Sequence, residues 1–109
     1  MLSKKYRLTK RGSFTYVYNK GERKFDSLMG LVFVRGKVKK IGFSVPNKIG
    51  KAIVRNKLKR RMRAIVREKL SNILPAQVVF TLKEGSSRLE YNDLKNIVHK
   101  LLTKSKLIS

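Results

Sequence analysis

The sequence contains no cysteine, and among its 109 residues only six are acidic and one is histidine. Without cysteine the chain forms neither disulfide bonds nor thiolate metal sites, which fits a reducing compartment. No stretch reaches the roughly 18 to 20 uncharged apolar residues that a membrane-spanning helix needs. The opening residues MLSKKYRLTK also lack the apolar core of a signal peptide. We therefore expect a cytoplasmic protein that has no membrane partner.

Positive charge dominates what is present. Lysine and arginine number 28, so the formal net charge is +22. A chain with this charge repels itself when it is compact, unless a polyanion neutralises it. Hydrophobic residues still make up 41% of the sequence, which is too many for a disordered basic tail. The composition predicts a folded nucleic-acid-binding protein, with residues 1–109 forming a single domain.

The first half of the sequence predicts one short helix followed by strands. The spacing of Phe14 and Tyr18 indicates a helix that is capped by Thr9 or Ser13. Residues 27–35 form a nearly continuous apolar run, which is typical of a strand packed on both faces. A two-residue turn at positions 36 and 37 then predicts a hairpin into a second strand. That return strand covers residues 39–45, and a further short strand is possible near residues 23–27.

The second half predicts a long helix, a strand and a final helix. Residues 51–70 have helical periodicity, and residues 77–82 are β-branched and aromatic. Ser87 and Glu90 have the spacing of a capping box that would begin the last helix. The apolar stripe of the long helix consists of Val54, Leu58, Met62, Ile65 and Val66. The order α-β-β-(β)-α-β-α predicts an α+β two-layer sandwich, whose helices cover one face of a small mixed sheet and leave part of the other open.

The long helix carries charge of almost one sign. Seven of the thirteen residues from 51 to 63 are lysine or arginine, and Glu68 is the only acid of the helix. A helix face that serves only solubility normally mixes both signs. We therefore predict a phosphate-binding face, on which each cation releases a counterion and arginine adds bidentate geometry. Its predicted residues are Arg55, Asn56, Lys57, Lys59, Arg60, Arg63 and Arg67.

Residues 41–63, IGFSVPNKIGKAIVRNKLKRRMR, resemble the signature of the bacterial ribonuclease P protein component. In that family a strand reading G-x-S-V leads through K-x-G into a helix reading A-x-x-R-N-[RK]-x-K-R-x-x-R. Lys57 departs from the family's more usual arginine, and Tyr18 stands where phenylalanine is frequent. The matching positions are Gly42, Ser44, Val45, Lys48, Gly50, Ala52, Arg55, Asn56, Lys57, Lys59, Arg60 and Arg63.

The resemblance implies both a fold and an activity. The implied fold is that of the second domain of ribosomal protein S5, in which a left-handed crossover through the basic helix joins two parallel strands. The implied activity is that of a protein subunit of the endoribonuclease that removes the 5′ leader from precursor tRNA. Its partners would be the ribonuclease P RNA and precursor tRNA, without an obligate protein partner. The RNA subunit would require Mg²⁺ and catalyse the cleavage, so no catalytic residue, metal site or cofactor is expected in this chain.

The resemblance also implies a cleft for the leader, between the first helix and the open sheet face. Phe14 and Tyr18 lie one helical turn apart, so their rings could stack on unpaired bases. Alternatively, both rings could belong to the core beneath the helix. Small residues at Gly42 and Ser44 would leave room for a nucleic-acid backbone. The predicted cleft residues are Phe14, Tyr18, Ser44, Lys48 and Lys51.

The acids and the single histidine do not form a pattern typical of a protein nuclease, which needs clustered carboxylates or a placed general acid. Glu90 and Asp93 have ligand-like spacing, but their position in the first turn of a helix favours capping. His99 lies among apolar helix positions, where a structural or exposed role is more frequent. An architectural ribosomal or nucleoid protein would share the charge and size, although such proteins often carry extended basic tails.

Overall fold

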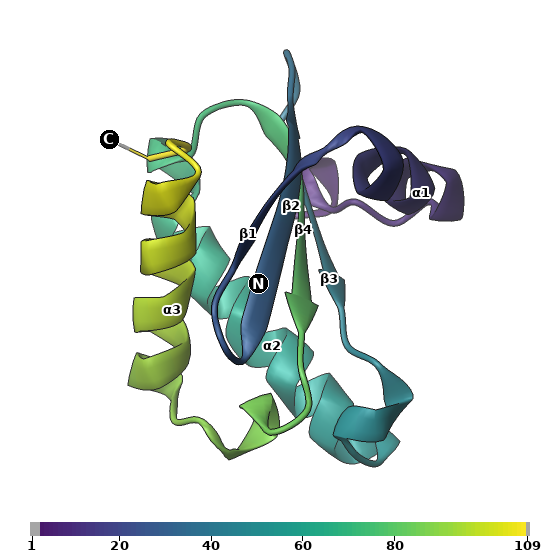
Figure 1. The fold of residues 1–109 in the computed structure, drawn as a ribbon, viewed down its shortest axis with the longest axis vertical. Helices are drawn as coiled ribbons and strands as arrows, with labels where there is room; N and C mark the ends of the chain where they lie inside the picture. The colour runs from purple at the N-terminus through teal and green to yellow at the C-terminus, as the bar shows by residue number, and fades with distance from the viewer. Residues whose placement is uncertain (1–2, 109) are drawn as a thin grey trace.

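The computed structural model describes residues 3–108, which form a four-stranded sheet and three α-helices. The elements in chain order are α1 (Arg11–Lys20), β1 (Glu22–Phe25), β2 (Met29–Arg35), β3 (Lys40–Ser44), α2 (Ala52–Lys69), β4 (Ala76–Leu82) and α3 (Tyr91–Lys104). Figure 1 shows α2 and α3 on one side of the sheet and α1 on the other. The predicted α+β class and order of elements are confirmed, including the short strand that precedes β2.

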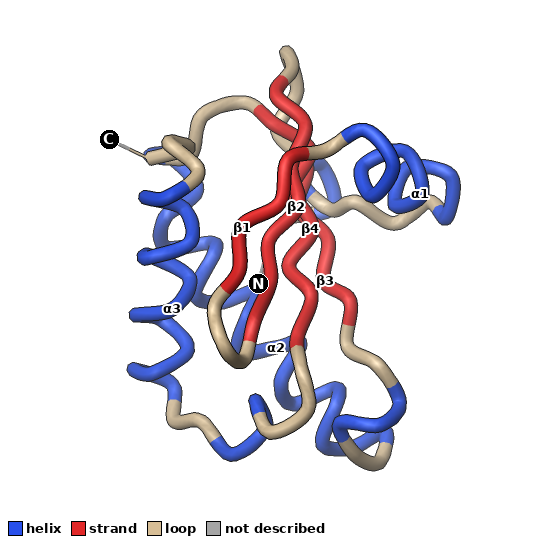
Figure 2. The backbone as a smooth tube through the Cα atoms, viewed as in Figure 1, coloured by secondary structure: helices blue, strands red, loops and turns tan. Residues whose placement is uncertain are grey.

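The strands lie in the order β1-β2-β4-β3, which makes the sheet mixed as predicted (Figure 2). β1 and β2 form an antiparallel hairpin, β2 is antiparallel to β4, and β3 is parallel to β4. The helix α2 therefore joins two parallel neighbours. The left-handed sense of this connection stays a prediction of the family resemblance.

The predicted hairpin between residues 27–35 and 39–45 is wrong, because β4 lies between those two strands. β4 pairs with every residue of β2 and every residue of β3. The connection from β2 to β3 instead passes over the start of β4, where the Gly36 N–H donates to the Pro75 carbonyl at 3.3 Å. A short connection thus resembles a hairpin turn locally while it spans the width of a third strand.

The main core lies between the sheet and the two helices α2 and α3. Side chains of β2 and β4 alternate between the two faces, so Leu31, Phe33 and Phe80 share the core face. On α2 the buried residues are Leu58, Met62, Ile65 and Val66. Val54, which was predicted in the same stripe, is 36% exposed. It lies in the first turn of α2 and packs over Gly50 rather than over the sheet.

A smaller core lies between α1 and the opposite sheet face. Leu8 and Val17 pack there against Val32 and Val79. Gly21 ends α1 as its C-cap, and a Cβ at this position would stand 2.5 Å from the carbonyl oxygen of Val17. Because that oxygen belongs to the backbone, only glycine fits the tight turn into β1. The remainder of this sheet face is left without a covering helix.

Two predicted helix caps are wrong. The N-cap residue of α1 is Lys10, which makes no side-chain capping hydrogen bond. Neither of the predicted caps, Thr9 and Ser13, is at this position. Ser87 lies in a 3-10 turn, Ser86–Arg88, and does not cap α3. The capping box of α3 consists of Glu90 and Asp93, and Asp93 Oδ2 accepts a hydrogen bond from the Glu90 N–H at 3.3 Å. The predicted capping role of those two acids is confirmed.

Candidate nucleic-acid interface

The exposed side of α2 carries most of the predicted phosphate-binding residues. Its buried stripe faces the sheet, so positions about half a helical turn away face solvent. Glu68, the one acid of the helix, accepts from Lys95 of α3 at 3.0 Å and from the Tyr91 hydroxyl at 3.3 Å. The hydrogen bond and charge of Lys95 hold the pKa of Glu68 below its ordinary value. The exposed members of the predicted set are Asn56, Lys57, Arg60 and Arg67.

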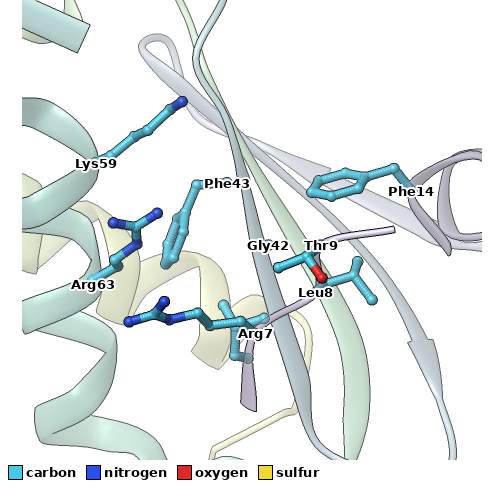
Figure 3. Close-up of a pocket in the computed structure, with 9 residues that line it drawn as sticks. Arg7, Leu8, Thr9, Phe14, Gly42, Phe43, Lys59 and Arg63 are labelled. Atoms are coloured by element: carbon cyan, nitrogen blue, oxygen red, sulfur yellow. The ribbon is translucent and has the colours of Figure 1, made fainter. Parts of the chain in front are cut away.

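The other predicted cations on α2 are half-buried and have more specific surroundings. Arg55 Nε donates to the Gly50 carbonyl at 3.1 Å, which ties the first turn of α2 to the preceding loop. Lys59 and Arg63 line a hollow at the edge of the sheet, together with Arg7 and Phe43 (Figure 3). The remaining lining residues are Leu8, Thr9, Phe14, Ile41 and Gly42. The hollow therefore reaches around the edge strand β3, from α2 to α1.

Adjacent residues of β3 face the two layers of the protein. Phe43 faces α2, and its ring stacks on Phe80 with 5.9 Å between the ring centroids. Gly42 faces α1, where a Cβ would stand 2.7 Å from Cζ of Phe14. The space at Gly42 is thus filled by the Phe14 ring. The prediction that Gly42 leaves room for a nucleic-acid backbone is wrong.

Phe14 and Tyr18 are both half-buried beside the smaller core, so each ring combines packing with an accessible edge. The Tyr18 hydroxyl lies 3.4 Å from Oγ1 of Thr81, which is paired in register with Ser44. Arg23 donates to the Tyr18 carbonyl at 2.6 Å, and its guanidinium carbon lies 6.0 Å from the ring centroid. The fold therefore brings Tyr18 and Ser44 to the same part of the open sheet face.

Lys48 and Lys51 lie beyond the carboxyl end of β3. Lys48 belongs to the 3-10 turn Asn47–Ile49, and Lys51 is the N-cap residue of α2. Both side chains are exposed. These lysines lie in the segment of the chain that connects β3 to α2.

Phe25 is a candidate that the sequence reasoning missed. It is 57% exposed, and it lies on the same sheet face as Arg23 because the two are separated by two positions in β1. Its ring covers Gly30, and Lys83 Nζ lies 5.1 Å from the ring centroid. Period-two alternation in β1 is the signal that could have placed it beside Arg23.

Asp26, an acid outside α2, makes structural contacts. In the β1–β2 turn, the Asp26 carboxylate accepts from Lys100 Nζ at 3.4 Å and from the Ser27 hydroxyl at 3.2 Å. Burial raises the pKa of Asp26. The hydrogen bonds from Lys100, Ser27 and the Leu28 backbone, together with the charge of Lys100, lower it by more, so that the pKa is below its ordinary value. His99 is exposed, and its Nδ1 lies 3.3 Å from Lys69 Nζ. Within residues 3–108, no group of three or more His, Asp or Glu side chains is arranged to hold a metal ion.

Comparison with known proteins identifies the family. A family model described as ribonuclease P matches residues 2–106. The chain belongs to the ribonuclease P protein family. The ribonuclease P protein component of Pseudanabaena sp. is 33% identical over 113 residues, which cover 99% of this chain and 97% of that protein. The ribonuclease P protein component of Phytoplasma australiense is 33% identical over 111 residues, covering 98% and 96%.

Solved structures of the family have the same fold. The ribonuclease P protein of Staphylococcus aureus superposes with a TM-score of 0.89 at 23% identity, covering 95% of this chain and 98% of that one. The ribonuclease P protein of Thermotoga maritima gives a TM-score of 0.82 at 26% identity, covering 90% and 96%. The family resemblance inferred from residues 41–63 is confirmed. No helix within the described part of the chain is long and apolar enough to cross a bilayer.

Proposed function

We propose that this chain is the protein subunit of a cytoplasmic ribonuclease P, the ribonucleoprotein that removes the 5′ leader from precursor tRNA. The observation that carries the proposal is the helix α2, which packs one face into the core and presents cations on the other. In a member of this family, the RNA subunit is the natural ligand of such a face. Each lysine or arginine that neutralises a phosphate releases a counterion, so affinity for the RNA would depend steeply on salt.

The leader would lie across the open sheet face, between α1 and β1. Phe14, Tyr18 and Phe25 offer aromatic rings there. Arg23 supplies charge beside Tyr18, and Lys83 supplies charge beside Phe25. Stacking on a ring accepts any base, because every base has a π face. This arrangement suits leaders of different sequence, since few contacts would depend on base identity.

Cleavage itself is assigned to the RNA subunit and its magnesium ions. Asp26 and Glu68 are bound to lysines, and Glu90 and Asp93 cap a helix. These carboxylates therefore serve the fold, whereas metal-dependent cleavage of a phosphodiester needs them free to bind the ion. The protein would contribute cations that lower phosphate repulsion and so strengthen substrate binding.

Reconstitution tests the proposal. We expect that adding this protein to purified ribonuclease P RNA accelerates removal of the leader at low magnesium concentration, whereas the protein alone leaves precursor tRNA intact. An equally basic ribosomal protein is the matched control. If both proteins accelerate the reaction equally, the architectural alternative is favoured. Cleavage by the protein without RNA would contradict the assignment of catalysis to the RNA.

A further inference from the structure

We propose that the connection between β2 and β3 forms a second contact for the backbone of the ribonuclease P RNA, in addition to the exposed face of α2. This inference rests on the proposed function and extends it to a surface that the sequence motif does not include. The surface is a hollow of about 370 Å³ at the end of the sheet. It is lined by Lys5, Tyr6, Lys37, Val38, Lys39, Lys40 and Pro75. We call it the tip hollow.

The tip hollow concentrates positive charge. Four of its seven lining residues are lysines, and none of them is acidic. Lys39 Nζ donates to the Leu70 carbonyl at 2.7 Å. Leu70 follows the last residue of α2, and a cation near the C-terminus of a helix interacts favourably with the helix dipole. Together with the Gly36 to Pro75 hydrogen bond of 3.3 Å, this contact fixes the position of the loop. A preformed cluster of cations binds phosphates without a further cost of ordering the loop.

Apolar and aromatic atoms lie among these lysines. Val38 is 55% exposed, and Lys5 Nζ lies 5.5 Å from the centroid of the half-buried Tyr6 ring. A loop that served only solubility would not expose valine between lysines. Sugars and base faces of a nucleic-acid strand have apolar surface beside each phosphate, so the mixture fits a strand of RNA.

The tip hollow is continuous with the basic helix. A second hollow, lined by Lys10, Ser13 and Gln77 among others, shares Val38 and Lys40 with it. That second hollow shares Arg7, Leu8 and Thr9 with the one lined by Lys59 and Arg63 of α2. The three form one groove around the edge of β3, and the described lining contains no acid. Because this groove connects the tip hollow to α2, the RNA subunit that binds α2 is the expected occupant of the tip hollow, and not precursor tRNA.

Salt dependence of RNA binding tests the tip hollow. The variant with Lys37→Gln and Lys40→Gln should weaken binding to the RNA subunit, and the slope of log affinity against log salt should fall by about 2, about 1 for each lysine. The matched control is Lys20→Gln with Lys104→Gln, which removes two exposed lysines of α1 and α3 outside the groove. Equal slopes for the two double variants would overturn the inference.

Crosslinking then identifies the RNA. Since the chain has no cysteine, Val38→Cys creates a single attachment point for a photoreactive group, and Asn96→Cys on α3 is the exposed control. In the holoenzyme with bound precursor tRNA, we expect the group at residue 38 to crosslink to the RNA subunit. Crosslinks only to precursor tRNA, or none above the control, would overturn the inference. The proposed function would survive either result if the reconstituted enzyme still removes leaders.

Discussion

The position of the Phe14 ring depends on Gly42, which has no side chain. The ring packs against Gly42 of β3, where a Cβ would stand 2.7 Å from Cζ of Phe14 and 3.1 Å from Cβ of Leu8. The position of the Phe14 ring on the sheet is therefore set by Gly42 of β3 and by Leu8 of the N-terminal segment. A side chain at residue 42 would displace the ring toward solvent without removing it.

We expect Phe14→Ala to weaken binding of leader-bearing precursor tRNA to the holoenzyme by about 1 to 3 kcal/mol, because one stacking contact is lost. Binding of mature tRNA should not change, since it has no leader. Equilibrium binding of both RNAs at one salt concentration measures the difference.

Two further variants separate stacking from packing. Phe14→Leu keeps most of the apolar volume against Gly42 but removes the ring, so it should fold normally and still lose leader affinity. Tyr16→Ala removes an aromatic ring of α1 that is 47% exposed and lies outside the described hollows, so it is the control. Equal losses for precursor and mature tRNA in the Phe14 variants would refute a leader contact.

Single residues were predictable from sequence where local spacing decides their position. The pattern of Phe14 and Tyr18 placed both rings on one side of α1, and the structure has both of them beside the smaller core. The filling of Gly42 by Phe14 was not predictable, because it arises when α1 docks on a strand some 28 positions away in sequence. Phe25 was missed because the four-residue strand β1 is too short to show its alternation clearly.

At the scale of elements, α2 separates its two roles by face. Leu58 and Met62 lie in the main core, while Arg60 is exposed and Arg63 lines the hollow beside β3. Substitutions on the outer face should therefore change RNA binding with little effect on folding.

We expect Arg60→Ala with Arg63→Ala to weaken binding of the RNA subunit and to reduce the salt slope by about 2. Lys20→Ala with Lys104→Ala gives the same change of charge on α1 and α3 and should leave the slope nearly unchanged. Filter binding between about 0.05 and 0.2 M salt covers the range in which this difference is large. An unchanged slope for the arginine variant would show that RNA does not bind this face, and thermal unfolding of each variant checks the fold.

Element types were read from the sequence more reliably than their pairing. Periodicity placed α2 and β4 within two residues of their observed bounds, because long amphipathic and continuous apolar patterns are local signals. The choice of β4, and not β3, as the partner of β2 is a tertiary effect. Both faces of β4 are apolar enough for the sheet interior, so it takes the position between two strands.

For the whole molecule, the main feature is the excess of positive over negative charge. The chain carries +22, and ion pairs in the described residues join Lys95 to Glu68 and Lys100 to Asp26. With 28 lysines and arginines against six acids, most of its cations cannot pair with a carboxylate. This imbalance was fully predictable from composition. The continuous groove around β3 was not, because it forms only when the N-terminal segment, α1 and α2 meet at one sheet edge.

We expect the melting temperature of the free protein to rise as sodium chloride increases from about 0.05 to 0.3 M, because screening reduces self-repulsion at separations near the Debye length of about 10 Å. Polyphosphate at micromolar concentration should raise it as well, since it binds the folded cations while ionic strength hardly changes. An uncharged polymer at the same mass concentration is the control. A melting temperature that falls with salt would mean that ion pairs outweigh repulsion.

Both edges of the sheet have features that hinder the pairing of a strand from another molecule. Along β3, the N-terminal segment forms a bridge between Arg7 and Ile41, and the Leu8 N–H donates to the Ile41 carbonyl at 2.8 Å. The opposite edge strand β1 is short, and three of its four residues are charged. Unprotected edge strands invite neighbouring molecules to add strands and build fibres. A copy that is not yet bound to RNA is therefore protected, by the short and covered edges of its own sheet, from pairing edge to edge with other copies.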